Sequence, residues 1–349
     1  LLAPLAEQYP DNTSLQRLVE RLSGQTGRAT TRPSGDASTS VTPENLSVDQ
    51  LVQKAHSAYD DAISSATAPD SARLRRAEEW LRTALDRTPT HVPALDLLAT
   101  LHRRQGDYET SATTLEKALE ENPRDAARWT RAATAYLRAH RYVNARSVAE
   151  EGLLLFPGHA PLARTAGVAS LRLGDASRAA DQFRKALDLL ADSAQSSQTA
   201  EVHAGLGLAY TQLDRPEAAT EAFETARSLA PDNPTVLRNS AYGLALRGTN
   251  LDRALMMARR AVKQSPSDPY ALDALGWVQF RRENLNAARR HLQRALDAGS
   301  SSARILEHFG DVQHALGNDA TAREYWQRAL DAAPGSSSLK KKLDDGSPS

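Results

Sequence analysis

The feature that most constrains the fold of this chain is a helix-breaking residue that returns at a fixed interval. Pro89, Pro123 and Pro157 are spaced by 34 residues, and later prolines of the same kind are Pro231, Pro266 and Pro334. Proline lacks an amide proton and disfavours helical geometry in the residue before it, so it ends a helix. An alanine-rich stretch precedes each one, as in LEKALEENP and WQRALDAAP. The sequence therefore predicts a series of short helices.

A turn signal divides each of these units into two halves. The signals are Gly106-Asp107, His140-Arg141, Gly174-Asp175, Asp214-Arg215, Gly248-Thr249, Glu283-Asn284 and Gly317-Asn318. Glycine just past a helix end supplies the left-handed residue that closes the helix. Both halves carry apolar residues at i, i+3, i+4 and i+7, which form one buried stripe. We therefore predict helix–turn–helix units that must stack on one another to bury their apolar faces.

These units resemble the tetratricopeptide repeat, which alternates large and small residues at fixed positions over 34 residues. In the last unit, which starts at Ala303, the match is carried by Leu306, Phe309, Gly310, Ala322, Trp326, Ala329 and Pro334. Small residues let helices approach closely, and bulky ones fill the space between them. Three positions depart from the pattern, with Ser111 at a small apolar position and His102 and Gln279 at an aromatic one. The resemblance implies an all-α fold, a right-handed α-α superhelix of about seven to eight repeats.

The regularity of the repeats varies along the chain. We expect a remnant of an upstream repeat with a short helix (1–23), a mobile linker (24–46), a degenerate repeat (47–91), three repeats (92–190), an insertion (191–199), four repeats (200–334) and a polar tail (335–349). The tail should form at most one capping turn, around Leu339 and Leu343. The incomplete first unit and the absence of an initiator Met lead us to expect a piece of a longer protein with more repeats upstream.

Charge and composition disfavour several classes of function. Lys+Arg and Asp+Glu both number 43, so no global field draws the chain to nucleic acid or an anionic membrane. The chain has no cysteine, which excludes disulfides and thiolate metal sites. No apolar run approaches the roughly 18–20 residues needed to span a bilayer. We therefore expect neither nucleic acid as a partner nor a membrane span.

The family resemblance also implies where a partner would bind. In this family the first helix of each repeat lines a concave groove, and five of its positions face a ligand. The groove residues expected on this basis are Arg131, Thr134, Arg138, Arg164, Arg172, Arg238, Asn239, Tyr242, Tyr270, Asp273, Trp277, Phe280, Glu307, Asp311 and His314. They run from basic through aromatic to acidic. Aromatic side chains in such a groove are frequent binding hot spots, and arginines pair with carboxylates.

Alternatives remain for these residues. Trp277 and Phe280 could instead pack against the following repeat, and the arginines could form a solvated charged face. Glu307, Asp311 and His314 share a helical face at i, i+4 and i+7, a spacing that could hold a divalent metal, although charged groove residues more often bind peptides or water. No phosphate-binding loop, dinucleotide fingerprint, nucleophile elbow or zinc-protease helix is present in the sequence. We expect no catalytic residue, no metal and no cofactor.

The C-terminal repeats suggest a setting for the protein. Segments such as NSAYGLALRGTNLDRALMMARRAV resemble the terminal repeats of bacterial tetratricopeptide proteins, many of which carry secretion signals or lipoprotein anchors. The leading hypothesis is a non-catalytic scaffold that holds a protein or peptide in its groove, as an assembly or adaptor factor of a bacterial periplasm or envelope. The alternatives are a regulatory or substrate-recruiting arm of a larger enzyme, a cytoplasmic location, and self-association through the end repeats.

Overall fold

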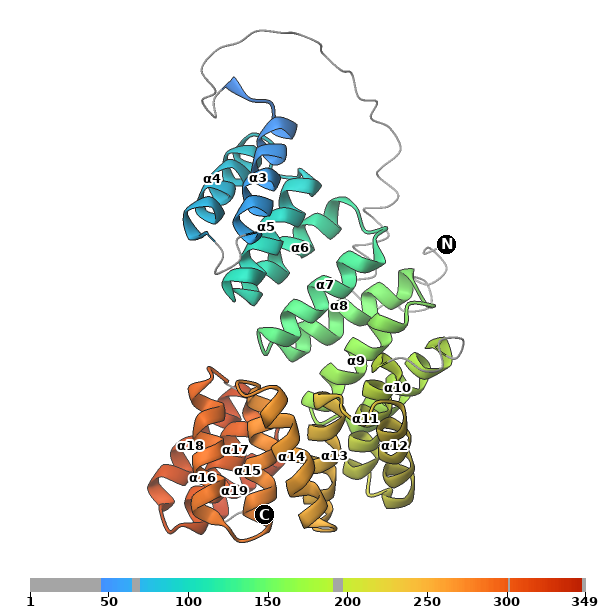
Figure 1. The fold of residues 1–349 in the computed structure, drawn as a ribbon, viewed down its shortest axis with the longest axis vertical. Helices are drawn as coiled ribbons and strands as arrows, with labels where there is room; N and C mark the ends of the chain where they lie inside the picture. The colour runs from blue at the N-terminus through green and yellow to red at the C-terminus, as the bar shows by residue number, and fades with distance from the viewer. Residues whose placement is uncertain (1–44, 65–69, 191–196, 301, 347–349) are drawn as a thin grey trace. The chain divides into compact units, whose positions relative to one another are not determined.

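A computed structural model describes residues 45–64, 70–190, 197–300 and 302–346. These residues form seventeen helices, labelled α3 to α19, and contain no strand (Figure 1). The chain divides into two compact units, Leu1–Pro157 and Gly158–Ser349. The all-helical stack of helix–turn–helix repeats expected from the sequence is confirmed. None of the helices in the described ranges is both long enough and apolar enough to cross a membrane.

The described part of the first unit contains three helix pairs, which are α3 (Val48–Ile63) with α4 (Ser71–Arg87), α5 (Val92–Gln105) with α6 (Tyr108–Glu121), and α7 (Ala126–Arg138) with α8 (Tyr142–Leu155). Ser47 begins α3 with a capping box, in which its side chain accepts from the Gln50 amide and the Gln50 side chain accepts from the Ser47 amide. Leu51, Leu81 and Leu101 are completely buried in the first core. The degenerate repeat expected before Pro89 is therefore a genuine helix pair.

The second unit contains five helix pairs and a final helix. The pairs are α9 (Ala160–Arg172) with α10 (Ala176–Leu190), α11 (Ser197–Gln212) with α12 (Pro216–Leu229), α13 (Pro234–Arg247) with α14 (Leu251–Gln264), α15 (Pro269–Arg281) with α16 (Leu285–Asp297), and α17 (Ala303–Ala315) with α18 (Asp319–Ala332). The final helix is α19 (Ser337–Asp345). In each pair, the first helix is called helix A and the second helix B below.

All seven predicted turns are present between the helices of a pair. The first residue of each has a positive φ, and these residues are Gly106, His140, Gly174, Asp214, Gly248, Glu283 and Gly317. Three of them are not glycine, so their side chains meet the steric cost of left-handed backbone. Between the positive-φ residue Gly248 and the start of α14 lie two residues, where the other turns have one, and the second of them, Asn250, also has a positive φ of 50°.

Two phenylalanines connect neighbouring repeats through glycines that leave room for their rings. A Cβ built on Gly167 or Gly205 would lie 2.8 or 2.6 Å from the Phe183 ring. A Cβ on Gly207 or Gly243 would similarly lie 2.7 or 2.5 Å from the ring of a second phenylalanine, Phe223. Each ring thus packs against helix A of its own repeat and helix A of the next, where any larger residue would clash.

The C-terminal end differs from the expectation. Residues 337–345 form a helix of nine residues rather than a single capping turn, because Leu339 is 1% exposed and packs with Leu306 and Trp326. The Ser336 side chain caps the start of this helix by accepting from the Leu339 amide. The expected N-terminal remnant, residues 24–44 of the linker and residues 191–196 of the insertion lie outside the described residues.

Candidate functional site

The predicted groove residues of the first unit lie on α7. Arg131 donates to Asp96 of α5 at 2.6 Å, and the same carboxylate receives two hydrogen bonds from the buried Arg128. Arg138 is exposed, and Thr134 is half-buried. On the helix-A face of this unit, Arg128 and Arg131 therefore share one carboxylate, and the exposed Arg138 lies about two turns after Arg131 on the same helix.

The second unit gathers arginines around one aromatic ring. The guanidinium carbon of Arg172 lies 4.0 Å from the centre of the Tyr270 ring, and those of Arg304 and Arg238 lie 5.4 and 5.8 Å from it. Arg238 also bonds Asp268, the N-cap residue of α15, at 2.7 Å. We call Arg172, Arg238, Tyr270 and Arg304 the arginine–tyrosine patch. Cations held over the face of an aromatic ring are attracted by its quadrupole.

A buried polar network lies next to this patch. Asp273 is completely buried, accepts from His308 Nδ1 at 2.6 Å and pairs with Arg304 at 2.8 Å. The other ring nitrogen of His308 lies 3.3 Å from the hydroxyl of Tyr242, which is 6% exposed. Burial raises the pKa of Asp273, but His308 and Arg304 outweigh that effect and hold the pKa below its usual value. Burial likewise raises the pKa of Tyr242.

The network orders Asp, His and Tyr as a proton relay would, but all three side chains are buried. Asp273, His308 and Tyr242 expose 0, 5 and 6% of their surface. A substrate therefore has no path to the relay in this arrangement, and its evident role is to fix α13, α15 and α17 against one another. Two predicted groove residues belong to this network. Tyr242 and Asp273 both contact His308 of the same chain instead of facing a ligand.

Trp277 and Phe280 stack on each other with ring centres 4.8 Å apart. Trp277 also stacks on His308 of the next repeat at 4.0 Å, which is the packing alternative left open by the sequence. Among the described residues the Trp277 Nε1 atom is buried without a hydrogen-bond partner. The ring of Trp277 therefore packs against the following repeat.

The acidic end of the predicted groove is held by α19. Lys342 lies 2.7 Å from Glu307 and 2.8 Å from both oxygens of Asp311, which also accepts from Trp326 Nε1. Burial lowers the pKa of Lys342, but the carboxylates of Asp311 and Glu307 outweigh it and raise the pKa. His314 turns to Asp319 instead. In the described residues no group of three or more His, Asp or Glu side chains is placed to hold a metal.

Two remaining groove residues, Arg164 and Asn239, lie apart from these clusters. Arg164 pairs with Glu201 of α11 at 3.4 Å, and Asn239 is half-buried on α13. Charged residues on the helix-A face of the second unit therefore pair with one another within the chain. Arg164 pairs with Glu201 at one end, and Lys342 pairs with Glu307 and Asp311 at the other. Its partly exposed aromatic centre is the arginine–tyrosine patch.

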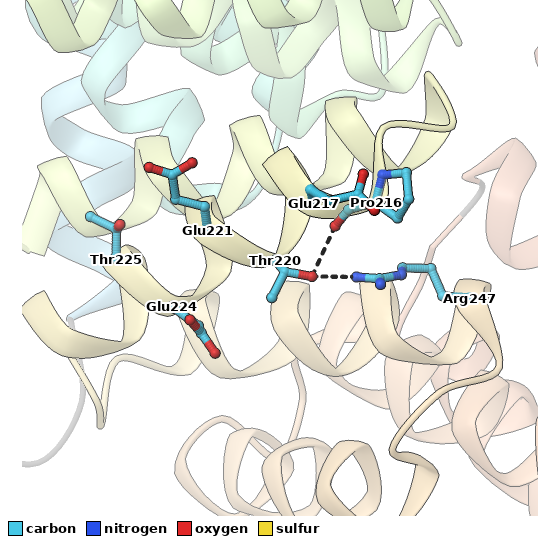
Figure 2. Close-up of a pocket in the computed structure, with 7 residues that line it drawn as sticks. All are labelled: Pro216, Glu217, Thr220, Glu221, Glu224, Thr225 and Arg247. Atoms are coloured by element: carbon cyan, nitrogen blue, oxygen red, sulfur yellow. Dashed lines mark hydrogen bonds between the residues drawn. The ribbon is translucent and has the colours of Figure 1, made fainter.

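A hollow of about 480 Å³ lies elsewhere, along α12 and the end of α13, and is lined by Pro216, Glu217, Thr220, Glu221, Glu224, Thr225 and Arg247 (Figure 2). Arg247 donates to the Thr220 hydroxyl at 2.7 Å. Figure 2 shows that Glu221 and Glu224 point in different directions, so their carboxylates do not converge on one ligand. None of the predicted groove residues lines this hollow.

Residues 97–160, 164–234 and 274–337, together more than half of the chain, match the tetratricopeptide repeat family. The chain belongs to that family. Solved structures with similar folds include the APC/C hetero-tetramer Cut9–Hcn1, with a TM-score of 0.50 and 16% identity over 83% of this chain and 58% of that one. The human IFIT1 dimer with m7Gppp-AAAA has a TM-score of 0.55 and 15% identity over 86% of this chain and 71% of that one. At such identities the likeness concerns the fold.

Three residues of the site were not indicated by the sequence. Arg304 occupies the second position of the last repeat, a groove position, and yet it was not among the expected residues. The sequence did not indicate Lys342, because residues 335–349 are expected to form a polar tail, whereas α19 packs against α18 where helix A of a further repeat would begin. Asp268 was not among the residues that the sequence singled out. Applying the repeat positions to Arg304 would have found it.

Proposed function

We propose that this chain is a protein-interaction scaffold that binds an acidic or carboxylate-bearing segment of a partner at the arginine–tyrosine patch. Tetratricopeptide repeats typically serve as non-catalytic scaffolds for protein interactions. The observation that supports this particular patch is the partly exposed Tyr270 ring with guanidinium groups of three helices around it. An aromatic ring and arginines held in place lose little freedom when a ligand binds, which favours recognition.

The residues that test this proposal differ from those that the sequence alone would select. Replacing Trp277 would remove its stacking on His308 and so disturb folding, which confounds any loss of binding. Arg172→Glu and Tyr270→Ala change the patch without removing a completely buried side chain. Arg103→Glu on α5, an exposed position in the other unit, makes the same change of charge as Arg172→Glu and serves as the control.

The experiment selects ligands from a library of random peptides on the immobilised full chain. Enriched peptides should be rich in acidic residues, and Arg172→Glu should weaken their binding about tenfold or more, the scale expected for reversing an interfacial charge. Arg103→Glu should bind as the wild type does, and all variants should keep their helical circular dichroism. Selected peptides without acidic character, or equal losses in Arg172→Glu and Arg103→Glu, would contradict the proposal.

We further propose that the scaffold acts as an assembly or adaptor factor in a bacterial cell envelope. The support is the resemblance of the C-terminal repeats to those of bacterial tetratricopeptide proteins with secretion signals or lipid anchors. Expression of the full reading frame in its source, followed by fractionation into cytoplasm, periplasm and membranes, tests the location. Recovery in the cytoplasmic fraction alone would contradict it, and an upstream catalytic domain in the reading frame would favour a role as the recruiting arm of an enzyme.

A further inference from the structure

The helix-B face of α14 and α16 is strongly basic in a chain whose net charge is zero. These two helices carry seven Lys and Arg residues against two Asp residues. Their arginines that point to solvent are Arg253, Arg259, Arg260, Arg289, Arg290 and Arg294. Such a local excess in a neutral protein creates a positive potential at one surface only.

Most of these arginines have no acidic partner within the described residues. Arg260 pairs with Asp232, and Arg282, in the turn between α15 and α16, pairs with Asp252. The described part of the chain places no carboxylate within ion-pair distance of Arg259, Arg290 or Arg294. Their guanidinium groups therefore keep their donors available for a ligand.

Arg259 and Arg290 stand at the edge of a hollow of about 650 Å³, which we call the α14–α16 hollow. Arg282 lines it as well, and Glu283 is the single acidic residue in its lining. Leu255, Leu285 and Leu316 also line the hollow, and all three are half-buried, so part of its wall is apolar. This combination of guanidinium groups and an apolar wall suits a ligand that carries both carboxylates and hydrophobic side chains.

His291 shows that charges of both helices act at the same place. It is half-buried on α16, and its Nδ1 atom is buried without a hydrogen-bond partner in the described residues. Burial lowers the pKa of His291, and Arg294, Arg290 and Arg259 lower it further. Because Arg259 belongs to α14, the positive field of the two helices converges between them.

We propose that the α14–α16 hollow binds an acidic segment of a partner protein, with carboxylates paired to Arg259 and Arg290 and a hydrophobic side chain against Leu255 and Leu316. Among the described residues, no Trp, Tyr or Phe lines the hollow, so nucleic acid bases would find no ring there to stack on. A recessed wall can surround a protein side chain, whereas the flat surface of a bilayer could not enter it.

This surface is formed by α14 and α16, by the end of α15 with the turn after it, and by Leu316 in the turn after α17. The arginine–tyrosine patch contains none of these residues, so the two proposals stand on different residues. The probe is a fluorescently labelled peptide in which glutamates alternate with leucines, titrated with the full chain and followed by anisotropy at about 0.15 M salt, where the Debye length is about 8 Å. Parallel titrations use a peptide with serine in place of leucine, single-stranded RNA, and vesicles rich in phosphatidylserine.

The decisive variant is Arg259→Glu/Arg290→Glu, and its control is Arg103→Glu/Lys117→Glu, which makes the same change of net charge at exposed positions of the first unit. The proposal expects the glutamate–leucine peptide to bind best, and the decisive variant to weaken it about tenfold or more while Arg172→Glu and the control leave it unchanged. Equal binding by the decisive variant, equal loss in the control, no advantage over the serine peptide, or tighter binding of RNA or vesicles would overturn it.

Discussion

The buried pair between Asp273 and Arg304 allows the sharpest test of the second unit. We consider Asp273→Asn, which keeps the shape of the side chain but removes its charge. Asp273 is completely buried, and it lies 2.8 Å from Arg304, whose side chain is 22% exposed, and 2.6 Å from His308. Removing one partner of a buried pair costs about 3–5 kcal/mol because the other charge is left uncompensated. Since Arg304 retains some solvent contact, we expect a loss near the lower limit, about 3 kcal/mol.

The assay is urea denaturation combined with hydrogen exchange of the α13, α15 and α17 amides, because the two units need not unfold together. Asp181→Asn supplies the control, since Asp181 pairs with Arg184 while both side chains are about three-fifths exposed. Exposed pairs of this kind contribute about 0–1 kcal/mol. A loss below about 1 kcal/mol for Asp273→Asn would refute the reasoning, as would additive losses in a double-mutant cycle with Arg304→Met.

The pH dependence gives a second measure of the same pair. The pKa of Asp273 is lower in the folded state than in an unfolded chain, so its stabilising contribution is present above the unfolded value of about 3.9 and is lost as pH falls through the folded value. The difference in free energy of unfolding between wild type and Asp273→Asn should therefore be full at pH 7 and shrink below about pH 4. A difference that stays constant into that range would contradict the role given to the charge.

Three further comparisons test local features. Glu283→Gly should raise the free energy of unfolding by about 1 kcal/mol by relieving left-handed backbone at a φ of 63°, while Gly317→Ala should lower it by a similar amount in the same denaturation assay. Gly205→Ala should cost about 1–2 kcal/mol, since its Cβ would lie 2.6 Å from the Phe183 ring, whereas Gly335→Ala, with no atom within 4 Å, should cost almost nothing; equal melting temperatures would contradict this. Lys342→Met should cost about 2 kcal/mol by leaving Asp311 buried without its cation, and hydrogen exchange in α19 should then accelerate; unchanged protection would show that the helix does not need the pair.

The sequence predicted the helices and turns well because both depend on local chemistry. The turns at His140, Asp214 and Glu283 could be predicted although none of them has a glycine, because the repeat interval of about 34 residues indicates where each turn falls. The extra residue after Gly248 was visible as a break in that interval. It is accommodated by a second left-handed residue, Asn250, which is a conformation that asparagine tolerates.

Charge partners were harder to predict than helices. The repeat positions of the family placed all the expected groove residues on helices A, but they do not indicate which of these side chains a neighbouring repeat engages. Asp273 and Asp311 are neutralised by Arg304 and Lys342, each of which lies two helices further along the chain. Such pairs depend on the angle between adjacent repeats, which composition and periodicity do not determine. The groove assignment as a whole remains a prediction.

The final helix shows how a stretch of sequence can be misjudged when its partners are ignored. Taken alone, SSLKKKLDD is short and polar, and isolated helices of this length are marginal in water. It becomes ordered because Leu339 fills a space beside Trp326 and Lys342 meets two carboxylates. Glu307 and Asp311 of α17 were expected to meet a partner in the groove. The cation that pairs with them is instead Lys342 of the same chain.

The phenylalanines of α10 and α12 have a consequence for how such a protein can change by duplication or exchange of its parts. Phe183 requires the absence of a side chain at both Gly167 and Gly205, and Phe223 makes the same demand of Gly207 and Gly243. A repeat copied or transplanted into this stretch without glycine at these positions would place a Cβ atom against one of the rings. Recombination in this region would therefore have to move several adjacent repeats as a block, so that each ring travels with both of its glycines.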